Sequence, residues 1–185
     1  MCWVTELLAR YLEGESFRIV LEHSRHVAGL ALEVATALDV TESDRLFIEE
    51  AALLHDIGVC QVHAPRLGLH GPHPYIMHGV IGREILEREG YPFHALVCER
   101  HTGVGLTCED ITRQELPLPN RDMCPRSLPE QIICFADLFY SKSPGRLAER
   151  KSVDTVRRKL LPFGKEKVAV FDAWLVQFGW SNLQH

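Results

Sequence analysis

The chain has 185 residues, 46% of them hydrophobic, and a formal net charge of -5. This length and composition fit one domain with a sizeable core and exclude a disordered chain. No apolar run reaches the roughly 18 residues that a membrane-spanning helix needs. The acidic start, MCWVTELLARYLEGE, does not read as a signal peptide, so we expect a cytoplasmic protein. The negative charge disfavours a nucleic-acid-binding surface.

The first third of the chain has helical periodicity. We expect a short helix over residues 5–12 and a long one over residues 16–38, with Ser16 as its N-cap. Apolar residues recur along the long helix at helical spacing from Ile19 onward, and His23 falls on that apolar face. The buried face of this helix therefore carries a polar side chain that needs a partner.

A third helix follows at TESDRLFIEE, where Thr41 or Ser43 is the expected N-cap. Its apolar run carries the chain to the pair His55-Asp56, and Gly58 is placed to end the helix. The pair thus lies in the last turn of a buried helix or just beyond it.

Two loops rich in proline separate the remaining helices. The first, QVHAPRLGLHGPHPYIM, is long enough to indicate a functional loop, and a helix from His78 to Gly90 follows it. A short helix around residues 92–101 stops at the HTGVG turn. The second loop, LPLPNRDMCPRSLP, leads into a helix over residues 129–140, which carries Asp137 on an apolar face. Two closing helices are expected over residues 152–161 and 165–178.

No segment predicts a strand, so we expect an all-α fold, a single compact helical bundle of about seven to nine helices. The chain forms one domain over residues 1–185, with its core at about 16–142 and the C-terminal helices of residues 152–179 packed on it.

Six residues with metal-ligating side chains are spread over these helices, roughly one to each. They are His23, His55, Asp56, His78, His101 and Asp137. Four imidazoles and two carboxylates suit one or two divalent transition metals, such as iron, manganese, zinc, nickel or cobalt. A lone histidine on an apolar helix face is more often a hydrogen-bonded core residue, and Asp137 has Arg83 or Arg100 as alternative partners. The residues alone therefore leave a metal site and a polar core both open.

Five segments resemble the successive motifs of the HD-domain superfamily of metal-dependent phosphohydrolases: LEHSRHVAGLALEVA, LLHDIG, HGVIGREIL, ERHTGVG and IICFADLFYSK. The letters HDIG match the HDIG subgroup. The resemblance covers about residues 16–142, and the later part is similar to the tail of small bacterial HD-domain proteins. It implies a helical bundle of the HD-domain type.

The resemblance also implies roles for single residues. The first ligand histidine of the family falls on His23, its HD pair on His55 and Asp56, and its last aspartate on Asp137. Members with two metals add two histidines, which match His78 and His101, and Asp56 is then the bridging carboxylate. Many related chains have a lysine directly after the last aspartate, where this chain has Leu138; Lys142 is the replacement that the sequence offers.

The expected activity is metal-dependent hydrolysis of a nucleotide or another small phosphoester by a metal-activated water. Asp56 or a nearby histidine would orient the nucleophile, and His70 or His73 would protonate the leaving group. The residues expected to hold phosphate are Arg83, Arg100 and Lys142. Two alternatives remain: a mixed-valent di-iron oxygenase of the HD type, and a non-catalytic metal or nucleotide sensor. Metal number and identity, the substrate and the oligomeric state stay open at this point.

Overall fold

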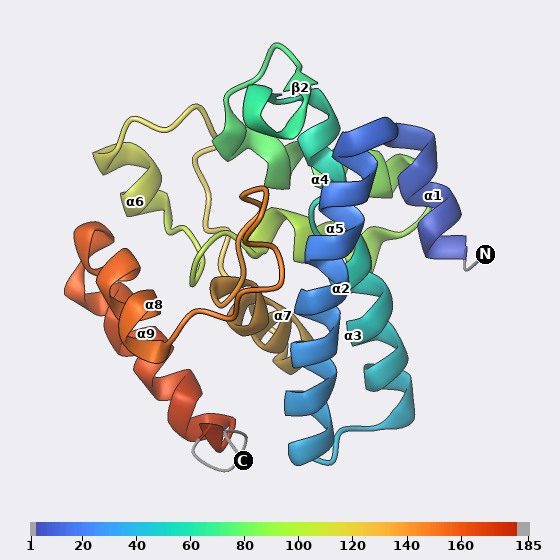
Figure 1. Ribbon diagram of the computed structural model, residues 1–185. Coiled ribbons are helices and arrows are strands. Elements are labelled where there is room, and N and C mark those ends of the chain that lie inside the picture. Colours follow the sequence, from blue (N-terminus) through green and yellow to red (C-terminus); the bar gives the residue numbers. More distant parts are fainter. Residues whose placement is uncertain (1–2, 181–185) are drawn as a thin grey trace.

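Helices make up most of the structure. The computed structural model describes residues 3–180, and within them it contains nine α-helices (Figure 1). They are α1 (Trp3–Tyr11), α2 (Gly14–Ala37), α3 (Glu42–Leu54), α4 (His78–Arg88), α5 (Pro92–Arg100), α6 (Cys108–Arg113), α7 (Leu128–Leu138), α8 (Val153–Leu160) and α9 (Lys165–Gln177). The all-α prediction is confirmed. None of the helices in this part of the chain is long and apolar enough to cross a membrane.

The sequence did not predict the small hairpin in the first proline-rich loop. Strand β1 (His63–Ala64) pairs antiparallel with β2 (Leu69–His70), and His63 lies opposite His70. Single turns of 3₁₀ helix surround it, at Ile57–Gln61, Pro65–Leu67 and Tyr75–Met77. Strands of two residues are too short to show an alternating pattern, so the sequence carried no signal for them.

Some helix boundaries differ from those expected. Thr41 caps α3 as predicted, because its hydroxyl accepts a hydrogen bond from the Asp44 amide. Ser16 is not a cap: α2 begins earlier, and the Ser16 hydroxyl donates to the Glu13 carbonyl inside the first turn. Gly58 does not end α3, which stops at Leu54. Helix α6 was missed, although Thr107 starts it with a capping box.

Helix α7 lies at the centre of the larger hydrophobic cluster. It packs on α2 and α3. The rings of its Phe135 and of Phe139, the residue that follows it, contact Phe171 of α9 at centroid distances of 5.8 Å each. In Figure 1, α8 and α9 form one flank of the molecule and α1 to α3 form the other. The helix that carries Asp137 is thus held from both sides by apolar contacts.

A close backbone contact fixes the segment after the His55-Asp56 pair against α4. A Cβ atom at Gly58 would lie 2.0 Å from the His78 carbonyl oxygen and 2.3 Å from the Gly82 nitrogen. Only glycine allows the two backbones to come this near. The contact brings the start of α4, and with it His78, next to Asp56.

Candidate metal centre

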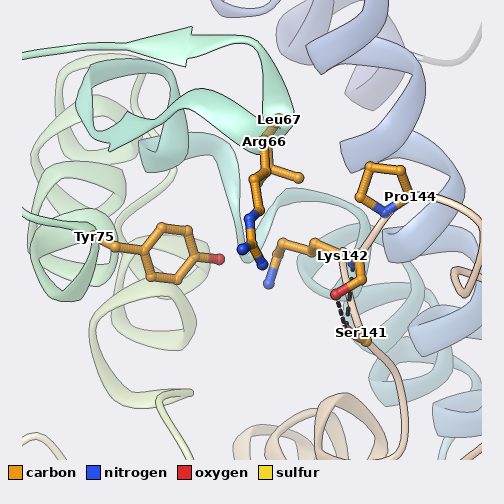
Figure 2. Close-up of a pocket in the computed structure, with 7 residues that line it drawn as sticks. Arg66, Leu67, Tyr75, Ser141, Lys142 and Pro144 are labelled. Carbon is orange, nitrogen blue, oxygen red and sulfur yellow. Dashed lines mark hydrogen bonds between the residues drawn. The ribbon is translucent and has the colours of Figure 1, made fainter.

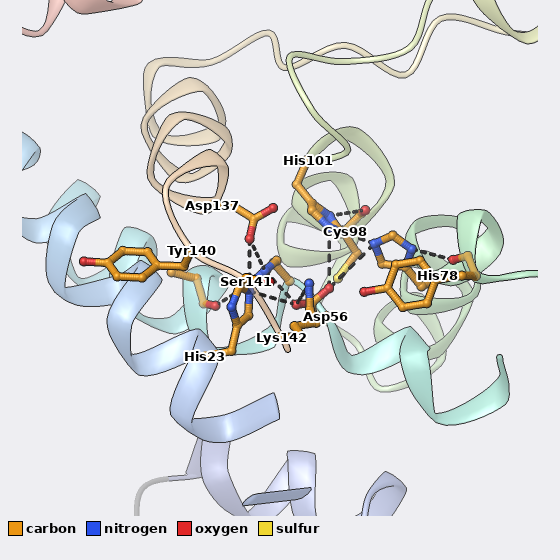
Figure 3. Close-up of polar contacts among 12 residues, drawn as sticks. His23, Asp56, His78, Cys98, His101, Asp137, Tyr140, Ser141 and Lys142 are labelled. Atoms are coloured by element: carbon orange, nitrogen blue, oxygen red, sulfur yellow. Dashed lines mark hydrogen bonds and ion pairs between the residues drawn. The ribbon is translucent and has the colours of Figure 1, made fainter. Parts of the chain in front are cut away.

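The six candidate ligands converge on one point in the interior. His23 comes from the middle of α2, the His55-Asp56 pair follows α3, His78 begins α4, His101 follows α5, and Asp137 lies near the end of α7. Figure 3 labels five of these side chains, which point toward one another: His23, Asp56, His78, His101 and Asp137. All are buried except Asp137, whose side chain is 18% exposed. Six residues that are far apart in sequence therefore share a single buried site.

The Asp56 carboxylate lies between two groups of imidazoles. Its Oδ2 atom is 2.9 Å from His55 Nε2 and 3.3 Å from His23 Nε2. Its Oδ1 atom is 3.6 Å from the Nε2 atoms of both His78 and His101. Each carboxylate oxygen thus faces its own pair of histidines.

Asp137 completes the first of these groups. Its Oδ1 atom lies 3.0 Å from His23 Nε2 and 3.5 Å from His55 Nε2. Two overlapping sets have all their ligand atoms within 4.8 Å of one another: His23, His55 and Asp137, and His55, Asp56 and His101. Both sets have the geometry of a small cation site.

Hydrogen bonds to the backbone orient three of the four imidazoles. The Nδ1 atoms of His55, His78 and His101 lie 2.6–2.7 Å from the carbonyl oxygens of Ala52, Tyr75 and Cys98, each three residues earlier in the chain. A carbonyl oxygen can only accept, so each Nδ1 carries a hydrogen and each ring turns its Nε2 atom inward. When Nε2 carries no hydrogen, this is the arrangement in which histidine binds metals through Nε2.

The Nε2 atoms of His78 and His101 face each other. They are 3.0 Å apart, and burial together with the neighbouring His101 lowers the pKa of His78 to about 3. His78 is therefore neutral at physiological pH, and its Nε2 atom can accept a hydrogen bond or bind a cation.

Electrostatics keep both carboxylates ionised. Burial alone would raise the pKa of Asp56, but His55 and Lys142 hold it well below its usual range. For Asp137, burial is likewise opposed by Lys142 and His23, and the pKa is again well below the usual range. The same two carboxylates raise the pKa of His55 to about 10 against the effect of burial. Lys142 and the protonated His55 supply positive charge to these two buried carboxylates.

Several buried polar atoms of the site make no hydrogen bond of good geometry among the described residues, although most of them have an ion-pair partner nearby. They are both ring nitrogens of His23, Nε2 of His55 and both carboxylate oxygens of Asp56. Buried polar groups are normally paired, and unpaired ones concentrate at functional sites. Imidazole and carboxylate together suit divalent first-row metals. The residues present therefore fit a metal centre.

Lys142 connects this centre to a surface pocket. Its Nζ atom lies 2.6 Å from Asp56 Oδ2, and the side chain is 14% exposed. Asp56 raises its pKa, although burial would lower it, so the ammonium stays protonated. The side chain also lines a cavity of about 460 Å³ (Figure 2). Of the three predicted phosphate-binding residues, Lys142 alone contacts the cluster.

The other predicted site residues lie elsewhere. Arg83 pairs with Glu87 and Glu99, and Arg100 pairs with Glu130. The suggestion that either arginine pairs with Asp137 is therefore wrong. Two more predicted residues, His70 and His73, lie in the hairpin segment, exposed and half-buried respectively, and no described polar contact joins their side chains to the cluster.

Sequence reasoning missed two residues of the pocket, Arg66 and Tyr75. The Tyr75 ring lies against His78, with centroids 4.8 Å apart, and its carbonyl accepts the hydrogen bond from His78 Nδ1. Both residues fall in the long loop that the sequence did single out. Loop composition was the available signal, and it does not distinguish one side chain of the loop from another.

Comparison with known proteins gives a family for the chain. The HD domain family matches residues 20–140. A tRNA (cytidine(56)-2'-O)-methyltransferase of Thermoplasma volcanium is 31% identical over 157 residues, which cover 84% of this chain and 41% of that protein. An uncharacterized protein of Methanocaldococcus jannaschii is 38% identical over 121 residues, 64% of each chain.

A second tRNA (cytidine(56)-2'-O)-methyltransferase, from Picrophilus torridus, is 32% identical over 124 residues, 66% of this chain and 32% of that protein. The chain thus spans less than two thirds of the length of each of these relatives. No solved structure matches it. The match to residues 20–140 spans every candidate ligand from His23 to Asp137. The chain belongs to the HD domain family.

Proposed function

We propose that this chain is a metal-dependent phosphohydrolase that acts on a nucleotide or another small phosphoester. Membership of the HD domain family points to a metal-dependent hydrolase. The observation that carries the proposal is the placement of Asp56, with one oxygen facing His23 and His55 and the other facing His78 and His101. A carboxylate flanked in this way suits a bridge between two cations.

In this proposal, His23, His55 and Asp137 would hold one metal, and His78 and His101 would hold a second. Asp56 would be shared by both. When bound, divalent ions at such a site activate water near neutral pH and neutralise charge on phosphoryl oxygens. The backbone hydrogen bonds of His55, His78 and His101 hold the rings ready for this role.

Lys142 supplies positive charge at the boundary between the cluster and the pocket. Its raised pKa keeps the ammonium protonated, which suits charge stabilisation more than proton donation. The structure gives no contact that would place His70 or His73 beside a leaving group. Their proposed role as proton donors therefore depends on the substrate reaching over the hairpin.

The names of two relatives raise methyl transfer and RNA as further candidates. This chain matches 41% and 32% of those two proteins, so the named activity can reside in the part that it does not match. The buried cluster of imidazoles and carboxylates favours hydrolysis over methyl transfer for the matched part. The names do give a reason to test RNA as a phosphoester substrate.

The experiment is a metal and substrate screen. Metal-stripped protein is reconstituted with Mn²⁺, Fe²⁺, Co²⁺, Ni²⁺ or Zn²⁺ and assayed with a phosphomonoester, a phosphodiester, nucleotides and tRNA. We expect phosphate or nucleotide release that requires a metal. No metal-dependent release from any substrate contradicts the proposal.

Two other outcomes would identify the alternatives. Oxygen consumption by the iron-loaded protein, with a mixed-valent electron paramagnetic resonance signal, would identify a di-iron oxygenase. A ligand-dependent change of partner or oligomeric state without turnover would identify a sensor.

A further inference from the structure

The pocket beside the cluster is formed by two loops. Its walls come from the hairpin region and from the loop after α7, and its volume is about 460 Å³, in the usual range for small-molecule sites. It is lined by Arg66, Leu67, Tyr75, Ser141, Lys142, Ser143 and Pro144. Figure 2 shows the Arg66 guanidinium, the Tyr75 hydroxyl and the Lys142 ammonium pointing toward one another. Three hydrogen-bond donors thus meet in one cavity.

Arg66 is available to a ligand. Its side chain is exposed and takes part in none of the ion pairs or side-chain hydrogen bonds of residues 3–180. By contrast, Arg83 and Arg100 are held by buried glutamates, Glu99 and Glu130. Unlike Arg83 and Arg100, Arg66 presents an uncompensated charge to the pocket.

The hairpin fixes the backbone that carries Arg66. Leu67 and Leu69 are 7% and 6% exposed and belong to the hydrophobic cluster under the hairpin. Gly68 makes the turn between them with a φ of 70°, and β1 pairs with β2 on either side. A flexible side chain therefore projects from an anchored turn, which limits the positions the guanidinium can reach.

Tyr75 joins the pocket to the metal centre. Its hydroxyl points into the cavity, while its ring lies against His78 and its carbonyl accepts from His78 Nδ1. Lys142 makes a second connection through Asp56. A group bound between these side chains would therefore lie directly beside the candidate ligands.

We infer that Arg66, Tyr75 and Lys142 form a binding site for the phosphate group of a phosphomonoester, so that monoesters are the substrate class of this site. The inference rests on the proposed function. A monoester phosphate carries a charge of about -1.5 to -2 near neutral pH and three acceptor oxygens. A diester has one charge and two free oxygens. A guanidinium can bind two oxygens at once, and that of Arg66 pairs with no carboxylate of residues 3–180. It therefore suits the additional oxygen and the additional charge that distinguish a monoester phosphate from a diester.

The first test is a calorimetric titration of the full chain with inorganic phosphate, with and without Mn²⁺. We expect Arg66→Ala to raise the Kd for phosphate about tenfold, and Arg66→Lys and Tyr75→Phe to raise it by smaller factors. Arg18→Ala is the matched control, because Arg18 is an exposed arginine on α2 that pairs only with neighbouring glutamates. Metal content and melting temperature are measured for every variant. An unchanged affinity in Arg66→Ala, or no phosphate binding by the wild type, overturns the inference.

The second test compares phenyl phosphate with bis(4-nitrophenyl) phosphate as substrates. We expect Arg66→Ala to reduce kcat/KM for the monoester more than for the diester. Equal losses overturn the assignment to monoesters. A wild type that binds phosphate through Arg66 but hydrolyses none of the substrates, the nucleotides and tRNA of the metal and substrate screen included, refutes the proposed function while supporting the subsite, so the two failures can be told apart.

Discussion

At the scale of single residues, local backbone geometry orients the candidate ligands. His55, His78 and His101 each lie at a helix end and bond through Nδ1 to the carbonyl three residues before. The same local contact, repeated three times, turns three Nε2 atoms toward Asp56. The inward orientation of each ring therefore depends mainly on a hydrogen bond within its own segment of the chain, and less on contacts with other helices.

Asp56→Asn is expected to reduce metal-dependent turnover by about 100-fold or more, because it removes the charge that faces both pairs of histidines. The matched control is Asp39→Asn, at an exposed position with a φ of 51°, which asparagine tolerates. Phosphate release at saturating Mn²⁺ is the measurement. Equal activity of the two variants would contradict a central role for Asp56.

Some residues of the candidate site could be recognised from the sequence, and others could not. The six cluster residues were recognisable, because each stands on an apolar helix face or at a helix end, where an unpaired polar side chain is conspicuous. Arg66 and Tyr75 were not, since periodicity says nothing about a loop. The sequence could not predict the ion pairs that Arg83 and Arg100 each form with a glutamate, for a different reason. Their partners Glu99 and Glu130 come into contact with them only through the packing of helices.

At the scale of elements, the contact between the turn after α3 and the start of α4 positions His78. Gly58→Ala would place a Cβ atom 2.0 Å from the His78 carbonyl, and backbone would have to move. We expect a loss of about 2 kcal/mol or more in the free energy of unfolding, together with weaker metal binding.

The control for this change is Gly29→Ala. Gly29 is an exposed position in α2, where an added Cβ meets nothing within 4 Å. It should be neutral or stabilising by up to about 1 kcal/mol, because alanine favours helices. Urea unfolding measures both variants. If Gly58→Ala were as stable as Gly29→Ala, the close contact would have no role in placing α4.

Lys151 holds the end of α7 and gives a pH-dependent test. Its Nζ donates to the Leu138 carbonyl at 2.9 Å and to the Tyr140 carbonyl, and burial lowers its pKa to about 8 from 10.5. Between these pH values the unfolded chain binds more protons than the folded one, so this group adds stability as the pH rises.

The free energy of unfolding of the wild type should therefore increase relative to that of Lys151→Met from pH 8 to about 10. Lys159→Met, at an exposed position of α8, should show no such trend. Urea unfolding at several pH values measures the difference. A difference that shrinks as the pH rises would contradict the burial of the Lys151 ammonium.

At the scale of the whole molecule, the C-terminal helices share a core with the helix that carries Asp137. Phe171 of α9 is fully buried against Phe135 of α7 and Phe139, the residue after α7. Periodicity predicted α8 and α9 but could not show which helix they cover, because that depends on the tertiary arrangement.

Phe171→Ala should lower the free energy of unfolding by about 3 kcal/mol or more, because it leaves a cavity in this core. Val176→Ala on the same helix is the control, since Val176 is 83% exposed and should cost less than about 0.5 kcal/mol. We expect one cooperative transition for both variants. Two separate transitions would show that the C-terminal helices fold apart from the rest.

The most direct test of the proposed centre is the metal content of purified protein after reconstitution with Mn²⁺, measured by plasma mass spectrometry. The wild type should bind two metals per chain, His78→Ala one, and Asp56→Asn fewer than His78→Ala, because Asp56 faces both halves of the cluster. A wild-type chain that retains no more metal than Asp56→Asn would contradict the account.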